Sequence, residues 1–235
     1  MSRRDQKGPV AIGLPGIIQV AGIIDQEEAD LVIDSGADML GFPLGLKDGR
    51  EDLCVEAAAA IVKNTSTLAT SVCITYHDTA DAVLELCGRL GVNWVQLHGH
   101  VSPEETARIK SLDPDMGIIK SLIVRSGNPD SLANEVREYE ELVDAFITDT
   151  FDPDTGRTGA TGMTHDWSVS RELVRQSRLP VILAGGLDDQ NVADSIGAVS
   201  PAAVDAHTGL EGPDGRKCAK KLRSFCRQAK DKLSG

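Results

Sequence analysis

An aspartate at the end of an apolar run is the first residue of this chain that could do acid–base chemistry. Asp149 closes the run Ala145–Thr148, whose composition is typical of a buried strand. A carboxyl group that is partly removed from water has a raised pKa and can donate a proton near neutral pH. Asp149 could instead only cap the loop that follows it, and the residues themselves do not favour either interpretation.

Three glycine-containing turns late in the chain could hold a phosphate group. Their residues are Gly159, Thr161, Gly162, Gly185, Gly186, Thr208 and Gly209. Glycine lets the backbone approach a ligand closely, and exposed N–H groups beside a helix N-terminus favour an anion. Each turn alone could be ordinary loop structure. Because the first turn lies in the long connection Thr150–Asp166, and long loops are usually functional, the three together predict a phosphate site.

Arg50 and several histidines are the remaining candidates for substrate contacts. Arg50 lies in a loop and could hold a carboxylate or be a solvated charge. His77 and His207 each follow an apolar run, where a histidine can titrate near neutral pH or only make hydrogen bonds at a rim. We expect His98 to make a structural hydrogen bond and His100 to be exposed. No spacing of possible ligands indicates a metal site.

The elements that must position these residues alternate between apolar strand-like runs and amphipathic helical runs. The predicted strands are 17–22, 38–42, 71–76, 93–97, 117–122, 145–149, 181–184 and 202–206. The predicted helices are 25–35, 51–63, 79–90, 103–111, 129–142, 167–177, 189–196 and 214–231. Eight such units favour an α/β fold with a single (β/α)8 TIM barrel, and an open doubly wound sheet is the alternative. In a barrel, the candidate residues after the strands meet at one face.

Composition limits the class of partner. The 235 residues suit one domain, with a barrel over 17–235 and a disordered N-terminal extension over 1–16. The net charge of −12 argues against a nucleic-acid partner, since phosphates would be repelled. No apolar run is long enough for a membrane span, and the five cysteines form no CxxC pair. We therefore expect a cytoplasmic protein with reduced thiols and a small-molecule ligand.

The order of several short motifs resembles the phosphoribosylanthranilate isomerase family. The resemblance covers about residues 17–225 and is carried by motifs at strand ends. These are Gly36-Ala37-Asp38, Gln96-Leu97-His98-Gly99, Asp149, the glycine loop leading to Asp166-Trp167, Ala184-Gly185-Gly186-Leu187 and Asp205–Glu211. The family has a ribulose-phosphate-binding barrel and belongs to tryptophan biosynthesis.

The resemblance also implies a reaction and a set of roles. Family enzymes convert an aminoaldose phosphate into an aminoketose phosphate by an Amadori rearrangement, without a cofactor. By position, Asp149 matches the general acid, and Arg50, Gln96, His77 and Asp205 match the residues around the substrate. The seven glycine-turn residues match the phosphate site. The implied partner is a small phosphorylated sugar, bound by a monomer or a homodimer.

One expected group is absent. Ala21 stands where the family carries its basic Cys, and Gln19 stands where Lys is usual. Alanine cannot accept a proton, and losing a general base typically costs about 10²–10⁴-fold in rate. His207 replaces Ser or Asn, on the strand that would lie beside strand one in a closed barrel. We therefore hypothesise that His207 serves as the base, with His77 as the less favoured substitute.

Three interpretations stay open at this point. The chain could be an isomerase of this family with a relocated base, or a barrel enzyme that acts on another phosphosugar. It could also be a non-catalytic binder of a sugar phosphate.

Overall fold

Eight parallel strands form the centre of the molecule. The structure is a computed structural model that describes residues 16–45, 53–125, 128–150 and 166–234. The strands are β1 (Ile17–Ala21), β2 (Met39–Leu44), β3 (Thr70–Thr75), β4 (Trp94–Leu97), β5 (Gly117–Val124), β6 (Ala145–Thr150), β7 (Val181–Leu183) and β8 (Ala203–Ala206). They pair in sequence order, and β8 pairs with β1 to close the barrel. The (β/α)8 prediction is confirmed and the open sheet is excluded.

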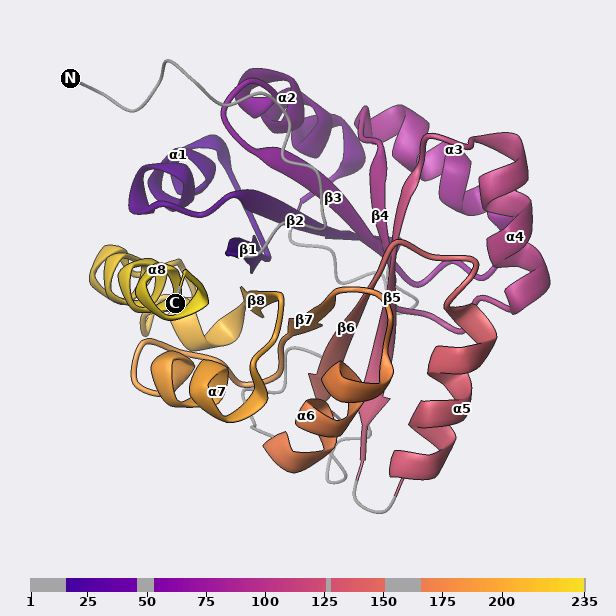
Figure 1. Cartoon of the computed structure of the whole chain (residues 1–235). Helices are drawn as coiled ribbons and strands as arrows, with labels where there is room; N and C mark the ends of the chain where they lie inside the picture. Colours follow the sequence, from indigo (N-terminus) through magenta and orange to yellow (C-terminus); the bar gives the residue numbers. More distant parts are fainter. Residues whose placement is uncertain (1–15, 46–52, 126–127, 151–165, 235) are drawn as a thin grey trace.

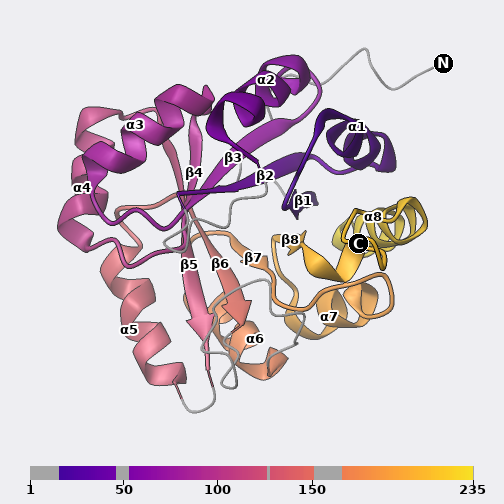
Figure 2. The same cartoon turned by 180° about the vertical axis from the view of Figure 1, so that it is seen from behind.

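Eight α-helices surround the barrel (Figures 1 and 2). They are α1 (Gln26–Ser35), α2 (Val55–Thr65), α3 (Ala80–Leu90), α4 (Pro103–Leu112), α5 (Pro129–Tyr139), α6 (Trp167–Gln176), α7 (Val192–Val199) and α8 (Ala219–Leu233). A short 3-10 helix, η1 (Thr208–Leu210), follows β8. No helix in the part of the chain that the structure describes is long and apolar enough to cross a membrane.

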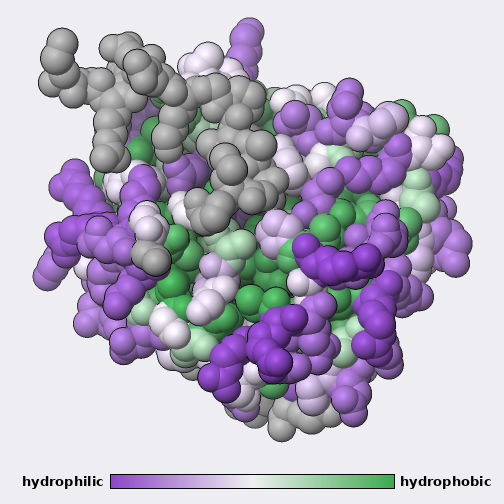
Figure 3. All heavy atoms as spheres, in the orientation of Figure 1, coloured by the Kyte–Doolittle hydropathy of each residue, from purple (hydrophilic) through white to green (hydrophobic). Residues whose placement is uncertain are grey.

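Two hydrophobic clusters result from the alternation of side chains along the strands. The inner cluster fills the barrel with residues such as Ile17, Val72, Ile147 and Ile182. The outer cluster lies between the strands and the helices. In the space-filling view, hydrophilic side chains dominate the periphery and hydrophobic ones are visible toward the middle (Figure 3). The inner cluster matters for function because it supports the polar residues above it.

Local signals explain most element boundaries. Asp25 caps α1 by accepting a hydrogen bond from the Glu28 N–H at 2.8 Å, and Ser102 caps α4 in the same way with Glu105 at 3.3 Å. Gly36 has a φ of 106° at the end of α1, which is the left-handed conformation that favours glycine. These capping residues are short-range signals, which is why most predicted boundaries lie within three residues of those observed.

The predicted helix starts at 51, 189 and 214 are wrong by three to five residues, since α2 starts at Val55, α7 at Val192 and α8 at Ala219. Helix α8 starts at Ala219 instead of 214, because Glu211 and Lys217 form an antiparallel bridge across a turn at Gly215. Helix α7 starts at Val192 instead of 189, because the Asp188 carboxylate accepts hydrogen bonds from the N–H groups of Gln190 and Asn191. Residues 1–15 lie outside the described ranges, so the N-terminal extension stays a prediction.

Candidate active site

The strand register aligns two layers of inward-facing residues on β6, β7, β8 and β1. Ile147, Ile182, Ala203 and Ile17 are neighbours on β6, β7, β8 and β1, and all four belong to the inner cluster. Two residues further along, where side chains again face inward, come Asp149, Ala184, Asp205 and Gln19. This row lies directly above the hydrophobic filling of the barrel, toward the carboxyl ends of the strands. It forms the floor of the candidate site.

Asp149 is a buried carboxyl group at the end of β6. Its Oδ1 accepts a hydrogen bond from the Thr150 N–H at 2.7 Å, and its Oδ2 lies 3.4 Å from Nδ1 of His98. Burial raises the pKa of Asp149 to about 7, although the Thr150 hydrogen bond opposes the rise. A group with that pKa can hold and release a proton near neutral pH, as a general acid must.

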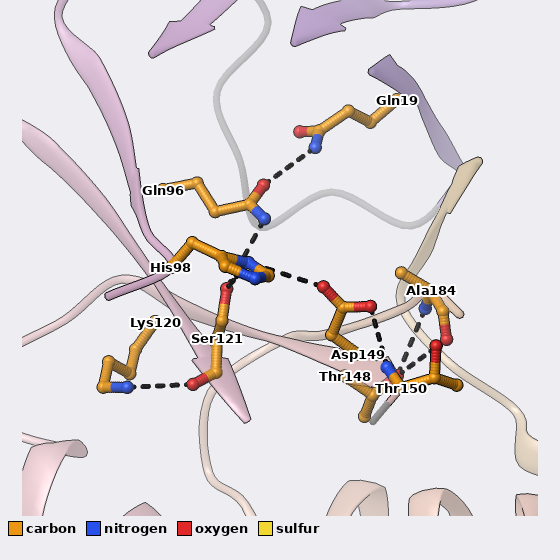
Figure 4. A network of polar contacts seen from close by, with 9 residues as sticks. All are labelled: Gln19, Gln96, His98, Lys120, Ser121, Thr148, Asp149, Thr150 and Ala184. Carbon is orange, nitrogen blue, oxygen red and sulfur yellow. Dashed lines mark hydrogen bonds and ion pairs between the residues drawn. The ribbon is translucent and has the colours of Figure 1, made fainter. Parts of the chain in front are cut away.

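A chain of polar contacts connects Asp149 to the opposite side of the barrel (Figure 4). Gln19 donates from Nε2 to Oε1 of Gln96 at 3.1 Å, and Gln96 donates from Nε2 to Oγ of Ser121 at 3.4 Å. Ser121 Oγ lies 3.3 Å from His98 Nδ1, which in turn contacts Asp149. The network spans β1, β4, β5 and β6 and fixes the orientation of the Asp149 carboxyl group.

His98 makes a side-chain hydrogen bond with Ser121, as the sequence predicted, and it also contacts Asp149. Its side chain is only 4% exposed, and its ring packs on Tyr76 with the centroids 4.6 Å apart. His98 therefore lies against the candidate acid. Ser121 was not predicted at all, although a serine at an inward position of the apolar strand β5 could have indicated it. His100 is exposed, as expected.

Asp205 is the second buried carboxyl group of the floor. It pairs in register with Gln19, and its Oδ1 has no hydrogen-bond partner among the described residues. Burial and the nearby charge of Asp149 raise the pKa of Asp205 to about 7, while Gln19 and Lys217 oppose the rise. Since two nearby carboxylates resist ionising together, Asp149 and Asp205 are electrostatically coupled.

His207 directly follows β8. Its ring lies across from the end of β1, beside Gly22, the residue after Ala21. A side chain on Gly22 would place its Cβ only 2.0 Å from His207 Nε2, so the ring rests directly against the Gly22 backbone. The same Nε2 lies 3.5 Å from Glu211 Oε1, and the side chain is 25% exposed. Desolvation, together with the Lys217 charge, lowers the pKa of His207 to about 3. The ring is thus neutral and a weak proton acceptor.

The loop after β8 is held by buried charges that the sequence did not single out. The Lys217 ammonium, on a side chain that is 1% exposed, contacts Glu211 Oε1 at 2.9 Å. The Lys217 N–H donates to Glu28 Oε1 at 2.7 Å, and Glu28 Oε2 accepts from the Ile24 N–H. These contacts join the ends of β1 and β8 and fix the position of His207.

The turns after β7 and β8 have the backbone geometry that a phosphate site needs. Gly185 and Gly186 have φ values of 96° and 65°, and no described residue accepts a hydrogen bond from either N–H. Asn191 stiffens the first turn by donating from Nδ2 to the Gly186 carbonyl at 2.9 Å. A side chain on Gly209 would meet the Leu187 carbonyl at 2.1 Å, so the two turns are in direct contact.

Of the other predicted site residues, only His77 lies in the described part of the chain, and it is found away from this cluster. His77 is half-buried against Gly45, whose Cβ would lie 2.8 Å from His77 Nε2, at the ends of β2 and β3. Arg50, Gly159, Thr161 and Gly162 lie outside the described residues. Within the described ranges, no group of three or more His, Cys, Asp or Glu side chains could hold a metal ion.

The fold and the site define a class of protein: a (β/α)8 barrel with coupled carboxyl groups and glycine turns at the carboxyl ends of its strands. The family model described as N-(5'phosphoribosyl)anthranilate (PRA) isomerase matches residues 18–228. The chain belongs to this isomerase family.

Individual relatives agree with this assignment. The chain is 35% identical over 215 residues to N-(5'-phosphoribosyl)anthranilate isomerase 2 of Methanosarcina mazei, covering 91% of this chain and 94% of the relative. The solved phosphoribosyl anthranilate isomerase of Thermotoga maritima is 27% identical with a TM-score of 0.77, covering 92% of this chain and 98% of that one. Another solved isomerase, at 26% identity and a TM-score of 0.75 with the same coverage, is in complex with reduced 1-(o-carboxyphenylamino)-1-deoxyribulose 5-phosphate.

Proposed function

We propose that this protein converts N-(5'-phosphoribosyl)anthranilate into the corresponding aminoketose phosphate, the isomerisation of tryptophan biosynthesis. The observation that carries the proposal is the buried Asp149 carboxyl group at the end of β6, with its pKa raised to about 7, in a member of this isomerase family. The site needs no redox partner, because the reaction moves hydrogen within one molecule.

Asp149 acts first in the proposed reaction. It donates its proton to the ring oxygen of the sugar, and the ring opens to a Schiff base. His98 and the Thr150 N–H hold the carboxyl group in place and accommodate the negative charge that remains on it. A base then removes the proton from C2, and the resulting enolamine rearranges to the ketone.

The phosphate of the substrate is proposed to bind at the turns after β7 and β8. The N–H groups of Gly185 and Gly186, which donate to no described residue, support this placement, together with the close packing of Gly209 on Leu187. We place Thr208, and the loop of Gly159, Thr161 and Gly162, at the same phosphate. Gln96 lies on the floor beneath the substrate, and Arg50 and His77 are proposed to contact its other end.

The identity of the base is the open part of the mechanism, because Ala21 has no titratable group. His207 is the candidate that the sequence suggested, and its ring does rest against the residue that follows Ala21. Its low pKa makes it a weak base in this arrangement. The second candidate among the described residues is Asp205, whose proton affinity is better matched to neutral pH.

Turnover of the pure protein tests the proposal. We expect conversion of N-(5'-phosphoribosyl)anthranilate with saturation kinetics, and growth without tryptophan when the chain is expressed in cells that lack the isomerase. Activity on another phosphosugar alone would favour the divergent-enzyme interpretation. Tight binding of sugar phosphates without any turnover would favour a non-catalytic binder. A mass measurement in solution would decide between a monomer and a homodimer.

A further inference from the structure

Two buried acceptor atoms in the floor have no hydrogen-bond partner among the residues that the structure describes. Asp205 Oδ1 and Gln19 Oε1 make no hydrogen bond with any described residue, although both residues are more than nine-tenths buried and adjacent in register. Buried polar atoms are normally paired, because leaving them unpaired costs free energy. Unpaired acceptors at the bottom of a candidate active site indicate a ligand that brings hydrogen to this position.

The strand register places Asp205 and Asp149 on either side of Ala184. They occupy the same row on β8 and β6, and the intervening strand β7 contributes Ala184 at that level. Alternate parallel strands are about 10 Å apart, twice the usual strand spacing. Alanine contributes only a methyl group at that level. A sugar chain there would have one carboxyl group on each side.

The surroundings of Asp205 keep it able to exchange a proton. Its neighbour on β1 is Gln19, which is neutral, and Asp149 faces it across Ala184 with a charge of the same sign. The cation that attracts it, Lys217, is held by Glu211 at 2.9 Å. Each carboxyl group has a pKa raised to about 7, so the pair carries about one proton near neutral pH. Such a pair can supply an acid and a base at the same time.

We infer that Asp205 is the base that removes the C2 proton, in place of a group on Ala21. The inference rests on the proposed function. The Asp205 carboxylate forms an O–H bond with the C2 hydrogen, the C2–H electron pair becomes the C1–C2 double bond, and the Schiff-base nitrogen receives the former C1–N π electrons. The protonated Asp205 then returns a proton to C1, while the C2 hydroxyl proton passes to the Asp149 carboxylate and restores the acid. Hydrogen moves from C2 to C1 and no outside oxidant is needed.

The first test is Asp205→Asn, which keeps the shape and removes the proton acceptor. We expect kcat for N-(5'-phosphoribosyl)anthranilate to fall at least 10²-fold, the magnitude typical of a lost general base. Affinity for the reduced 1-(o-carboxyphenylamino)-1-deoxyribulose 5-phosphate should change less than threefold. Asp194→Asn, on the exposed face of α7, is the matched control and should keep wild-type kcat. A kcat within threefold of wild type in Asp205→Asn would overturn the inference.

Two further variants separate proton abstraction from a structural role. In the Asp205→Asn background, Ala21→Cys supplies a new proton acceptor on the neighbouring strand and should raise kcat at least tenfold. No gain over Asp205→Asn alone would place the defect outside proton abstraction and would also overturn the inference. Gln19→Lys puts a cation beside Asp205, which favours its ionised form. The acidic limb of the kcat profile should then move to lower pH, and an unmoved limb would contradict the assignment.

Turnover by wild type and by Asp205→Asn distinguishes an error in the proposed function from an error in the assignment of Asp205. If the wild-type protein does not turn over the substrate at all, the proposed function is wrong and the inference falls with it. If wild type is active and Asp205→Asn is equally active, only the assignment of Asp205 is wrong.

Discussion

At the scale of single residues, proton transfer depends on how far each carboxyl group is removed from water. Burial of Asp149 and Asp205 disfavours their charged carboxylate forms, so their protons are held near neutral pH. Burial acts in the opposite direction on His207, since it disfavours the charged imidazolium form. The same desolvation therefore makes the carboxyl groups useful and the imidazole a poor base.

Replacing Asp149 with Asn should be the most damaging conservative substitution in the site. The amide keeps the shape but has no proton to give to the ring oxygen, so we expect kcat to fall about 10²–10⁴-fold. The affinity for reduced 1-(o-carboxyphenylamino)-1-deoxyribulose 5-phosphate, an analogue of the product, should be nearly unchanged. Steady-state kinetics with an analogue titration checks both expectations, and near wild-type turnover would show that Asp149 is not the acid.

Replacing His207 with Asn distinguishes the two candidate bases. If Asp205 is the base, the neutral His207 contributes position only, and kcat should fall less than tenfold. A fall of 10²-fold or more with intact analogue binding would instead support the base role that the sequence suggested for His207. Measuring His207→Asn and Asp205→Asn under identical conditions gives a direct ranking.

At the scale of elements, a strand or helix could be predicted from the sequence where residues close together in the chain determine it. Apolar runs and capping residues are short-range features, so all eight strands and helices were expected from the sequence. The start of α8 was missed because the Glu211–Lys217 bridge depends on contacts with Glu28, far away in the chain. Asp149 was found by its position at a strand end. Its pairing with Asp205 across Ala184 depends on barrel closure, which no local pattern specifies.

The turn after β7 is the element that the phosphate proposal depends on. Gly186 has a φ of 65°, so Gly186→Val should strain the backbone and block the approach of a phosphate. We expect a loss of at least tenfold in affinity for inorganic phosphate and for the product analogue. Gly197→Ala is a matched control, because a Cβ at Gly197 in α7 meets nothing within 4 Å. Unchanged affinity in a folded Gly186→Val protein would contradict this placement.

At the scale of the whole molecule, the raised carboxyl pKa values reduce stability. Between the unfolded pKa near 3.8 and the folded value of about 7, the folded protein binds more protons at Asp205 than the unfolded chain does. The contribution of Asp205 to the free energy of unfolding therefore falls as the pH rises from about 4 to about 7. His207 has the opposite sign, because its folded pKa is about 3 and its unfolded value is 6.5. Wild type and Asp205→Asn both contain His207, so its contribution to the free energy of unfolding cancels when the two are compared.

Asp205→Asn should consequently stabilise the fold while it removes activity. Relative to wild type, the variant's free energy of unfolding should increase between about pH 4 and pH 7, by about 4 kcal/mol in total, and stay constant above that. Denaturant unfolding at a series of pH values measures this difference. A difference that is independent of pH would mean that Asp205 ionises normally in the folded protein.

We expect this member of the family to isomerise its substrate with Ala at position 21. The most direct measurement is the turnover of N-(5'-phosphoribosyl)anthranilate by the pure wild-type protein, compared with Asp149→Asn prepared in the same way. We predict saturable conversion by wild type, at least 10²-fold faster than by the variant. Conversion by wild type that is no faster than by Asp149→Asn, or than without protein, would show that the chain does not catalyse this isomerisation through Asp149.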